Sequence, residues 1–156
     1  MVNVNFDDAL FSREQKLGIG VVIRDAQGAV LASLSKILCH IHSPFEVEGL
    51  AAASALQLAS DLGFQEVILD GDCQVLVLAL KHDSDFLSAY GIILDVVRLK
   101  ARCFNKLHYF HVNREGNMVA HGLARFVLNV LYCNVWMKDV PPQFHSLVLA
   151  DSDGIH

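Results

Sequence analysis

Residues 46–73, EVEGLAAASALQLASDLGFQEVILDGDC, decide the fold that the sequence predicts. Apolar residues recur there at helical spacing and alanine is abundant, which predicts a helix over Glu46–Leu62 that ends at Gly63. The following short apolar run, Glu66–Asp70, is typical of a buried strand. The stretch therefore predicts a long helix, then a buried strand, with Asp72 just beyond the end of that strand.

Three strands are predicted before this helix. Apolar and polar residues alternate over Val2–Asp7, which is the period of a strand with one buried face. Gly18–Arg24 is almost entirely apolar, and the turn-forming residues Asp25–Gly28 separate it from a further strand over Ala29–Leu38. Short connections of this kind predict an antiparallel meander at the start of the chain.

The C-terminal half predicts further helices and one more strand. These are helices over Gln74–Lys81 and Ala89–Arg102, a strand over Lys106–Val112, a polar loop over Asn113–Gly116 and an amphipathic helix over Asn117–Leu131. The whole order predicts an α/β fold with a mixed five-stranded sheet, in which three antiparallel strands precede βαβ-type units and helices cover both faces. We expect one domain over residues 1–150 and a polar C-terminal tail over residues 151–156.

The composition excludes several classes of protein. The chain has 156 residues, of which 53% are hydrophobic, so it is large enough for one domain with a real core. No apolar run approaches the ~20 residues of a spanning helix, and no secretory signal is visible, so we expect an intracellular protein without a membrane partner. Four dispersed cysteines without a CxxC pair do not support a zinc knuckle. A net charge of -5 argues against binding nucleic acid by bulk positive charge.

Three acidic residues occupy element ends that a sheet brings together. Asp7 ends the first predicted strand, Glu48 lies in the first turn of the long helix and Asp72 follows the fourth strand. Close carboxylates repel one another unless cations hold them, and oxygen ligands suit Mg²⁺ or Mn²⁺. Two such ions would activate water for attack on a phosphodiester. Alternatively, Asp7 could cap a turn, and Glu48 or Glu46 could merely favour the helix N-terminus.

Several segments together resemble the plant ribonuclease H-like domain found in non-LTR retroelement polyproteins and in free-standing plant proteins. They are residues 4–9 (VNFDDA), 18–32 (GIGVVIRDAQGAVLA), 46–73 as quoted above, 111–125 (HVNREGNMVAHGLAR) and 135–151 (VWMKDVPPQFHSLVLAD). The resemblance covers nearly the whole chain. It implies a ribonuclease H-like fold and metal-dependent endonucleolytic cleavage of the RNA strand of an RNA–DNA hybrid, leaving a 3′-hydroxyl and a 5′-phosphate.

The resemblance also implies a role for individual residues. The metal-binding positions of the family fall on Asp7, Glu48 and Asp72, and its fourth acidic position falls on His121. Arg114 lies in the loop where many such enzymes carry a mobile histidine, but arginine stays protonated and cannot shuttle a proton. The loop from Arg114 is expected to cap the last helix through Asn117, and both residues could contact a phosphate of the substrate.

Two departures from the family pattern affect this expectation. Asp8 stands where the family has glycine, which predicts strain in a turn and places another carboxylate beside the metals. His121 replaces a carboxylate, and an imidazole suits Mn²⁺ better than Mg²⁺. Because of these departures we expect the activity of the hydrolase to be weak. From the acidic cluster we expect two bound Mg²⁺ or Mn²⁺ ions, and from the lack of a secretory signal we expect the protein in the nucleus or cytoplasm. The alternatives are a domesticated domain that binds nucleic acid or protein as a regulatory module, and a nuclease acting on single strands.

Overall fold

The structure is a computed structural model that describes residues 1–38, 43–82, 91–129 and 132–154. Its strands are β1 (Val2–Phe11), β2 (Lys16–Arg24), β3 (Val30–Leu38), β4 (Glu66–Gly71), β5 (Lys106–His111) and β6 (Cys133–Met137). Its α-helices are α1 (Pro44–Asp61), α2 (Gln74–Lys81), α3 (Gly91–Ala101), α4 (Met118–Arg125) and α5 (His145–Gly154). Short 3₁₀ turns lie at Arg114–Asn117 (η2), Phe126–Asn129 (η3) and Pro142–Phe144 (η4).

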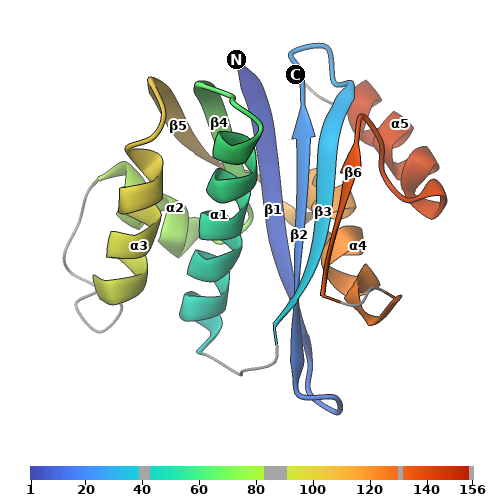
Figure 1. The fold of residues 1–156 in the computed structure, drawn as a ribbon, viewed down its shortest axis with the longest axis horizontal. Coiled ribbons are helices and arrows are strands. Elements are labelled where there is room, and N and C mark those ends of the chain that lie inside the picture. The colour runs from blue at the N-terminus through green and yellow to red at the C-terminus, as the bar shows by residue number, and fades with distance from the viewer. Residues whose placement is uncertain (39–42, 83–90, 130–131, 155–156) are drawn as a thin grey trace.

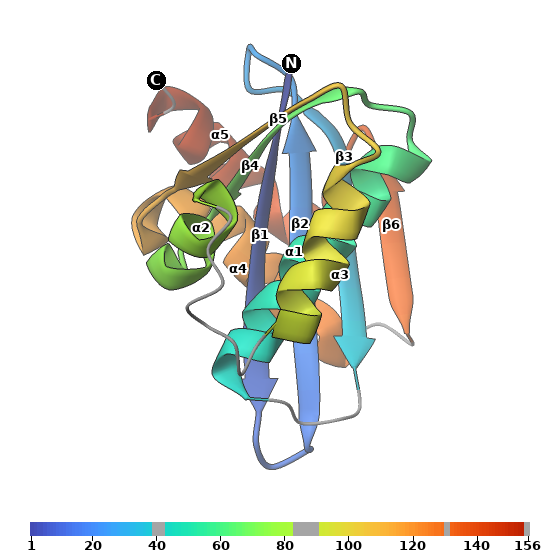
Figure 2. The same cartoon turned by 90° about the vertical axis from the view of Figure 1, so that its left-hand side faces the viewer.

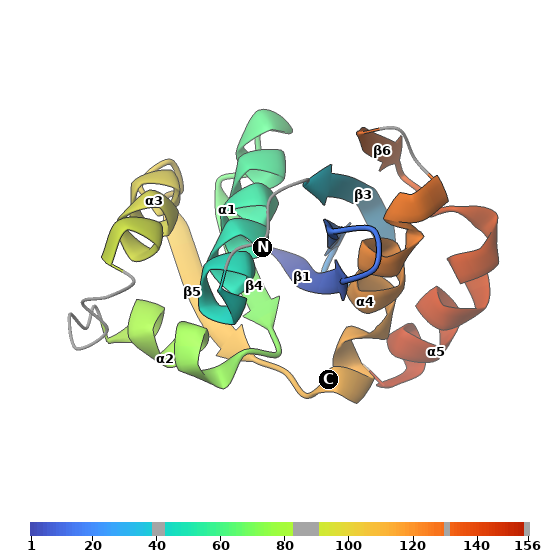
Figure 3. The ribbon, with the colours of Figure 1, turned by 90° about the horizontal axis from the view of Figure 1, so that it is seen from below.

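The strands form one mixed sheet in the order β5-β4-β1-β2-β3-β6. β1 pairs in parallel with β4 and β4 with β5, while β1, β2, β3 and β6 pair antiparallel. Helices α1 and α3 cover one face of this sheet, and α4 and α5 lie on the other side (Figure 1; Figure 2; Figure 3). The predicted mixed α/β sheet with helices on both faces is therefore confirmed, but its sheet has six strands and not five.

The sixth strand and the last helix depend on packing that the local sequence does not reveal. Most of β6 is exposed, and only Trp136 within it is half-buried, so the strand has no alternating pattern. It forms because it pairs with β3, and it thereby becomes the edge strand of the sheet. Helix α5 extends to Gly154, into the segment 151–156 that was expected to be a tail, because Phe144, Leu147 and Val148 pack against the core beside α4.

Strand β2 is buried on both sides, which explains its almost uninterrupted apolar sequence. Ile19, Val21 and Ile23 belong to the core under α1 and α3, whereas Val22 faces the smaller core under α4. On the α4 side a Cβ atom added to Gly20 would lie 2.0 Å from the carbonyl oxygen of Ala120. Glycine at this position thus lets the backbone of α4 lie directly on β2.

Element boundaries differ from the predicted ones at several places. The helix predicted over Asn117–Leu131 is shorter, because α4 gives way to η3 after Arg125, and residues 130–131 lie outside the described residues. The predicted start of α3 at Ala89 also lies outside them. Strand β1 continues through Asp8, which is paired with Ile19. The expected strain at Asp8 is therefore wrong, since the residue lies in a strand and not in a turn.

None of the helices in the described ranges is long and apolar enough to cross a membrane.

Candidate metal centre

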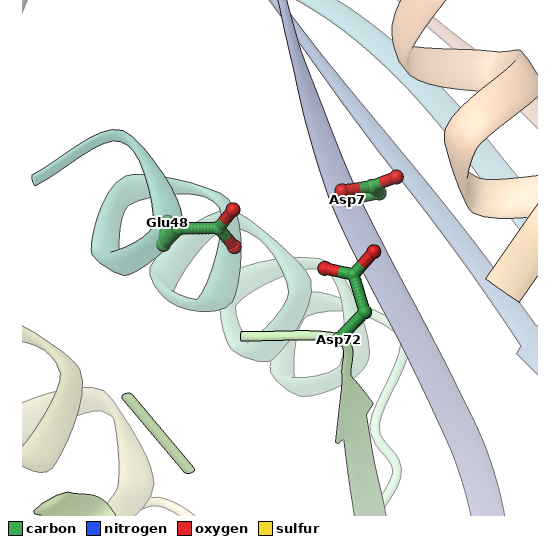
Figure 4. Close-up of side chains that lie close together, drawn as sticks. All are labelled: Asp7, Glu48 and Asp72. Atoms are coloured by element: carbon green, nitrogen blue, oxygen red, sulfur yellow. The ribbon is translucent and has the colours of Figure 1, made fainter. Parts of the chain in front are cut away.

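Three carboxylate side chains from separate elements meet at one point of the sheet. Asp7 comes from β1, Glu48 from the N-terminal part of α1 and Asp72 from the position directly after β4 (Figure 4). One carboxylate oxygen from each lies within 4.8 Å of those of the other two. The register explains the meeting of the two aspartates, because parallel pairing aligns Asn5 with Asp70, and each aspartate follows two residues later.

The start of α1 selects Glu48 over Glu46 for this cluster. Ser43 is the N-cap residue and its hydroxyl oxygen accepts a hydrogen bond from the backbone N–H of Glu46 at 3.4 Å. The same hydroxyl donates to the Glu46 carboxylate at 3.1 Å, so this side chain is occupied at the helix cap. Glu48 lies two residues further on and its side chain reaches toward β1 (Figure 4). The alternative left open by the sequence is thereby resolved.

Burial and mutual repulsion favour the protonated forms of Asp7 and Glu48 when no cation is present. Burial, followed by the charge of Asp72, raises the pKa of Asp7 from 3.8 to about 6. Burial also raises the pKa of Glu48 from 4.5 to about 10, with a hydrogen bond to Asp8 as the next cause. Two ionised groups at this separation repel by about 3 kcal/mol at an effective dielectric constant of about 20. A bound cation would remove this penalty and displace the protons.

The donor set fits a hard divalent cation. All three ligand atoms that meet are carboxylate oxygens, the donors that Mg²⁺ and Mn²⁺ prefer. Asp7 is 3% exposed. Within the described part of the chain, Glu48 Oε2 is inaccessible to solvent and has no hydrogen-bond partner. A buried acceptor of this kind is costly unless a ligand satisfies it, so the residues present fit the metal that the sequence predicts.

His121 contacts this cluster through Asp7. Its Nδ1 atom lies 2.9 Å from Asp7 Oδ2, and its side chain is 25% exposed. When Asp7 is ionised, Nδ1–H donates to the carboxylate and fixes its orientation. His121 is not among the ligand atoms that meet within 4.8 Å. The structure thus brings all four predicted residues together, with His121 placed beside the three carboxylates.

Asn117 lies behind the site and not on its surface. The residue is 1% exposed, and its side-chain amide donates to the carbonyl oxygen of Phe6 at 2.9 Å. Its amide oxygen accepts a hydrogen bond from Asn5 at 3.2 Å. The expected side-chain cap of α4 by Asn117 is wrong, because these contacts already use the side chain, and Asn113 instead caps η2. Asn117 ties the start of α4 to β1 next to Asp7, and no exposed surface supports its expected contact with substrate.

Two further residues flank Asp72. Arg114 Nε lies 3.9 Å from Asp72 Oδ2, and the arginine side chain is 72% exposed. His111 Nε2 lies 3.2 Å from the backbone carbonyl oxygen of Asp72. From the sequence His111 is interpreted as a structural strand residue, but it ends β5 opposite Gly71 in the parallel register and so lies beside Asp72. That register was the signal that could have found it.

Comparison with known proteins places this geometry in a family. No curated protein matches the chain, whereas many solved structures do. Ribonuclease H1 of Halobacterium salinarum NRC-1 is 24% identical with a TM-score of 0.74, over 83% of this chain and 98% of that chain. The N-terminal ribonuclease H domain of rv2228c from Mycobacterium tuberculosis is 20% identical with a TM-score of 0.71, over 82% and 93%. LC11-RNase H1, solved in complex with an RNA/DNA hybrid, is 21% identical with a TM-score of 0.66, over 79% and 93%.

The structural similarity to these proteins establishes the fold, and a family model establishes the family to which the chain belongs. The model described as reverse transcriptase-like matches residues 5–127, a span that contains Asp7, Glu48, Asp72 and His121. The chain therefore belongs to the reverse transcriptase-like family and has a ribonuclease H-like fold.

Proposed function

We propose that this protein is a ribonuclease H-type endonuclease that hydrolyses the RNA strand of RNA–DNA hybrids in a metal-dependent reaction. The observation that carries the proposal is the meeting of the Asp7, Glu48 and Asp72 carboxylates within 4.8 Å at the end of β4. The ribonuclease H-like fold supports it, and so does the similarity to LC11-RNase H1, which was solved with a hybrid bound.

In this proposal the three carboxylates hold two divalent ions, Mg²⁺ or Mn²⁺. When bound, the ions supply Lewis acidity that activates water and stabilises the leaving oxygen of the phosphodiester. Asp7, Glu48 and Asp72 bind and space the ions, while His121 orients Asp7 through the 2.9 Å hydrogen bond and assists as a peripheral ligand. Asn117 holds β1 and α4 together so that Asp7 and His121 keep this geometry.

Arg114 is the residue best placed to meet the charged substrate. Its guanidinium group is largely exposed and lies 3.9 Å from a carboxylate oxygen of Asp72. Because the group stays protonated, it contributes positive charge to a phosphate near the cluster and does not transfer a proton. This charge matters because the chain as a whole has a net charge of -5.

The proposal is tested by incubating the protein with a labelled RNA–DNA hybrid, duplex DNA, single-stranded RNA and single-stranded DNA. Each substrate is tested with Mg²⁺, Mn²⁺ or EDTA. We expect cleavage of the hybrid's RNA strand alone, with 3′-hydroxyl and 5′-phosphate products, and loss of cleavage in EDTA or with Asp72→Asn. The control is Asp95→Asn, which removes a 79% exposed carboxylate on α3. No cleavage of any substrate at high enzyme concentration would contradict the proposal.

A second candidate is a domesticated domain that binds nucleic acid or protein without cleaving it. The hydrogen bond between Glu48 and Asp8 favours this candidate, because it stabilises Glu48 in its protonated form and opposes metal binding. The same assay separates the two functions when binding to the hybrid is measured alongside cleavage. Hybrid binding without cleavage in either metal supports the binding module, and cleavage of single strands supports a different nuclease.

A further inference from the structure

Asp8 lies next to Asp7 in β1 but belongs to the opposite face of the strand. Successive side chains of a strand point to opposite faces, and Asp8 of β1 is paired with Ile19 of β2 within the sheet. Its backbone N–H donates to Asp7 Oδ1 at 2.8 Å, which holds the two residues in a fixed relation. Its carboxyl group is hydrogen-bonded to Glu48 on α1. Asp8 thus approaches the acidic cluster from the side of α1, and not from the side of α4.

The carboxyl groups of Asp8 and Glu48 each bury an unsatisfied oxygen. Asp8 Oδ1 and Glu48 Oε2 are inaccessible to solvent and have no hydrogen-bond partner among the described residues. In the same part of the chain, neither group forms an ion pair with lysine or arginine. Two facing acids with orphaned oxygens are unfavourable unless a shared proton or a cation lies between them. The arrangement therefore suits a divalent cation that displaces the shared proton and also satisfies the orphaned oxygens.

We propose that Asp8 is a fourth carboxylate of the metal centre and that it binds, together with Glu48, one of the two divalent ions. This inference rests on the proposed function. Charge balance supports it, because Asp7, Glu48 and Asp72 offset only three of the four positive charges of two divalent ions. A histidine side chain supplies no negative charge, and Asp8 supplies the fourth from within β1.

A different role for Asp8 makes the opposite prediction. If Asp8 only repels its acidic neighbours and shares a proton with Glu48, its removal lowers the repulsion and makes metal binding tighter. If Asp8 binds an ion, its removal makes metal binding weaker. The sign of the change in Mn²⁺ affinity thus separates the two roles, without any measurement of cleavage.

The experiment is a titration of Mn²⁺ into the metal-free protein at pH 8, followed by calorimetry, with bound ions counted by electron paramagnetic resonance. We expect two bound ions for the wild type. For Asp8→Asn, which keeps the size of the side chain, we expect loss of one ion or a decrease of about 10- to 100-fold in its affinity. Asp95→Asn is the matched control for removal of an exposed negative charge and should leave both ions bound. Circular dichroism confirms that each variant is folded.

The outcomes distinguish this inference from the proposed function. Equal or tighter Mn²⁺ binding by Asp8→Asn overturns the inference, even when the wild type cleaves the hybrid. Weaker binding by Asp8→Asn supports the inference, even when the wild type cleaves no substrate and the proposed function fails. A wild type that binds no Mn²⁺ overturns both.

Discussion

Replacing Gly20 by alanine should separate α4 from the sheet and thereby disturb the candidate metal centre. Gly20 lies on β2 opposite Asp7 of β1, and α4 rests on both strands at this point. His121 is carried by α4, and its hydrogen bond to Asp7 is the contact between this helix and the carboxylate cluster. A methyl group at position 20 would therefore displace α4 and with it His121, the residue that contacts Asp7.

The structure gives the size of this effect. The added Cβ would lie 2.0 Å from the carbonyl oxygen of Ala120 and 2.4 Å from the backbone nitrogen of Ala124, whereas ordinary contact begins at 3.4 Å. Both neighbours are backbone atoms, so the helix itself must move by about an ångström or more. The His121–Asp7 hydrogen bond of 2.9 Å cannot absorb such a shift. Overpacking of this kind costs about 1–3 kcal/mol in the free energy of unfolding.

Urea denaturation and the imidazole nitrogen resonances of His121 measure the two consequences. We expect Gly20→Ala to be less stable by the amount given and to change the Nδ1 signal of His121. Gly91→Ala is the control, because a Cβ at Gly91 meets no atom within 4 Å. A Gly20→Ala variant with unchanged stability and an unchanged His121 signal would show that α4 does not need glycine at position 20.

Three more predictions concern residues around the cluster. Asn117→Ala should lower the free energy of unfolding by about 1–3 kcal/mol, because the Phe6 carbonyl and the Asn5 amide lose their buried partner. Denaturation with urea measures this loss, and a change below about 0.5 kcal/mol contradicts the prediction. The pKa of Asp7 is raised from 3.8 to about 6, so the folded state binds this proton more tightly than the unfolded state. The metal-free wild type should therefore lose stability relative to Asp7→Asn as the pH rises from about 4 through about 6. Melting curves in EDTA measure this difference, and a difference that stays constant with pH is the opposing result. His121→Ala should weaken Mn²⁺ binding about 10- to 100-fold by releasing the Asp7 carboxylate, as measured by calorimetry, and unchanged affinity would exclude that role.

The meeting of Asp7 and Asp72 could be predicted from the strand patterns, because each residue lies two positions beyond the last pair, Asn5 and Asp70, of the parallel strands β1 and β4. The prediction that Asp7 ends its strand was wrong, since β1 continues to Phe11 through its pairing with β2. Glu48 could not be separated from Glu46 by pattern alone, because both lie in the first turns of one helix. Which glutamate joins the cluster depends on Ser43, whose hydroxyl donates a hydrogen bond to the Glu46 carboxylate at the helix cap.

Other features depend on contacts between distant segments and had no local signal. Asn117 stands in the N-cap position of α4, where asparagine usually caps, but its side chain bonds to β1 across 111 residues of sequence. His111 meets Asp72 through the register of β4 and β5. Asp8 seemed to belong to a turn, since the extension of β1 to Phe11 depends on its pairing with Lys16. Strand β6 likewise exists through its pairing with β3.

The most direct test of the metal centre is the anomalous scattering of Mn²⁺ in crystals of the protein soaked in that ion. We expect anomalous peaks among the carboxylates of Asp7, Glu48 and Asp72, whose oxygens already lie within 4.8 Å of one another. The same crystals soaked in EDTA should show no peak. Well-ordered carboxylates without any anomalous peak at millimolar Mn²⁺ would contradict the assignment of a metal centre.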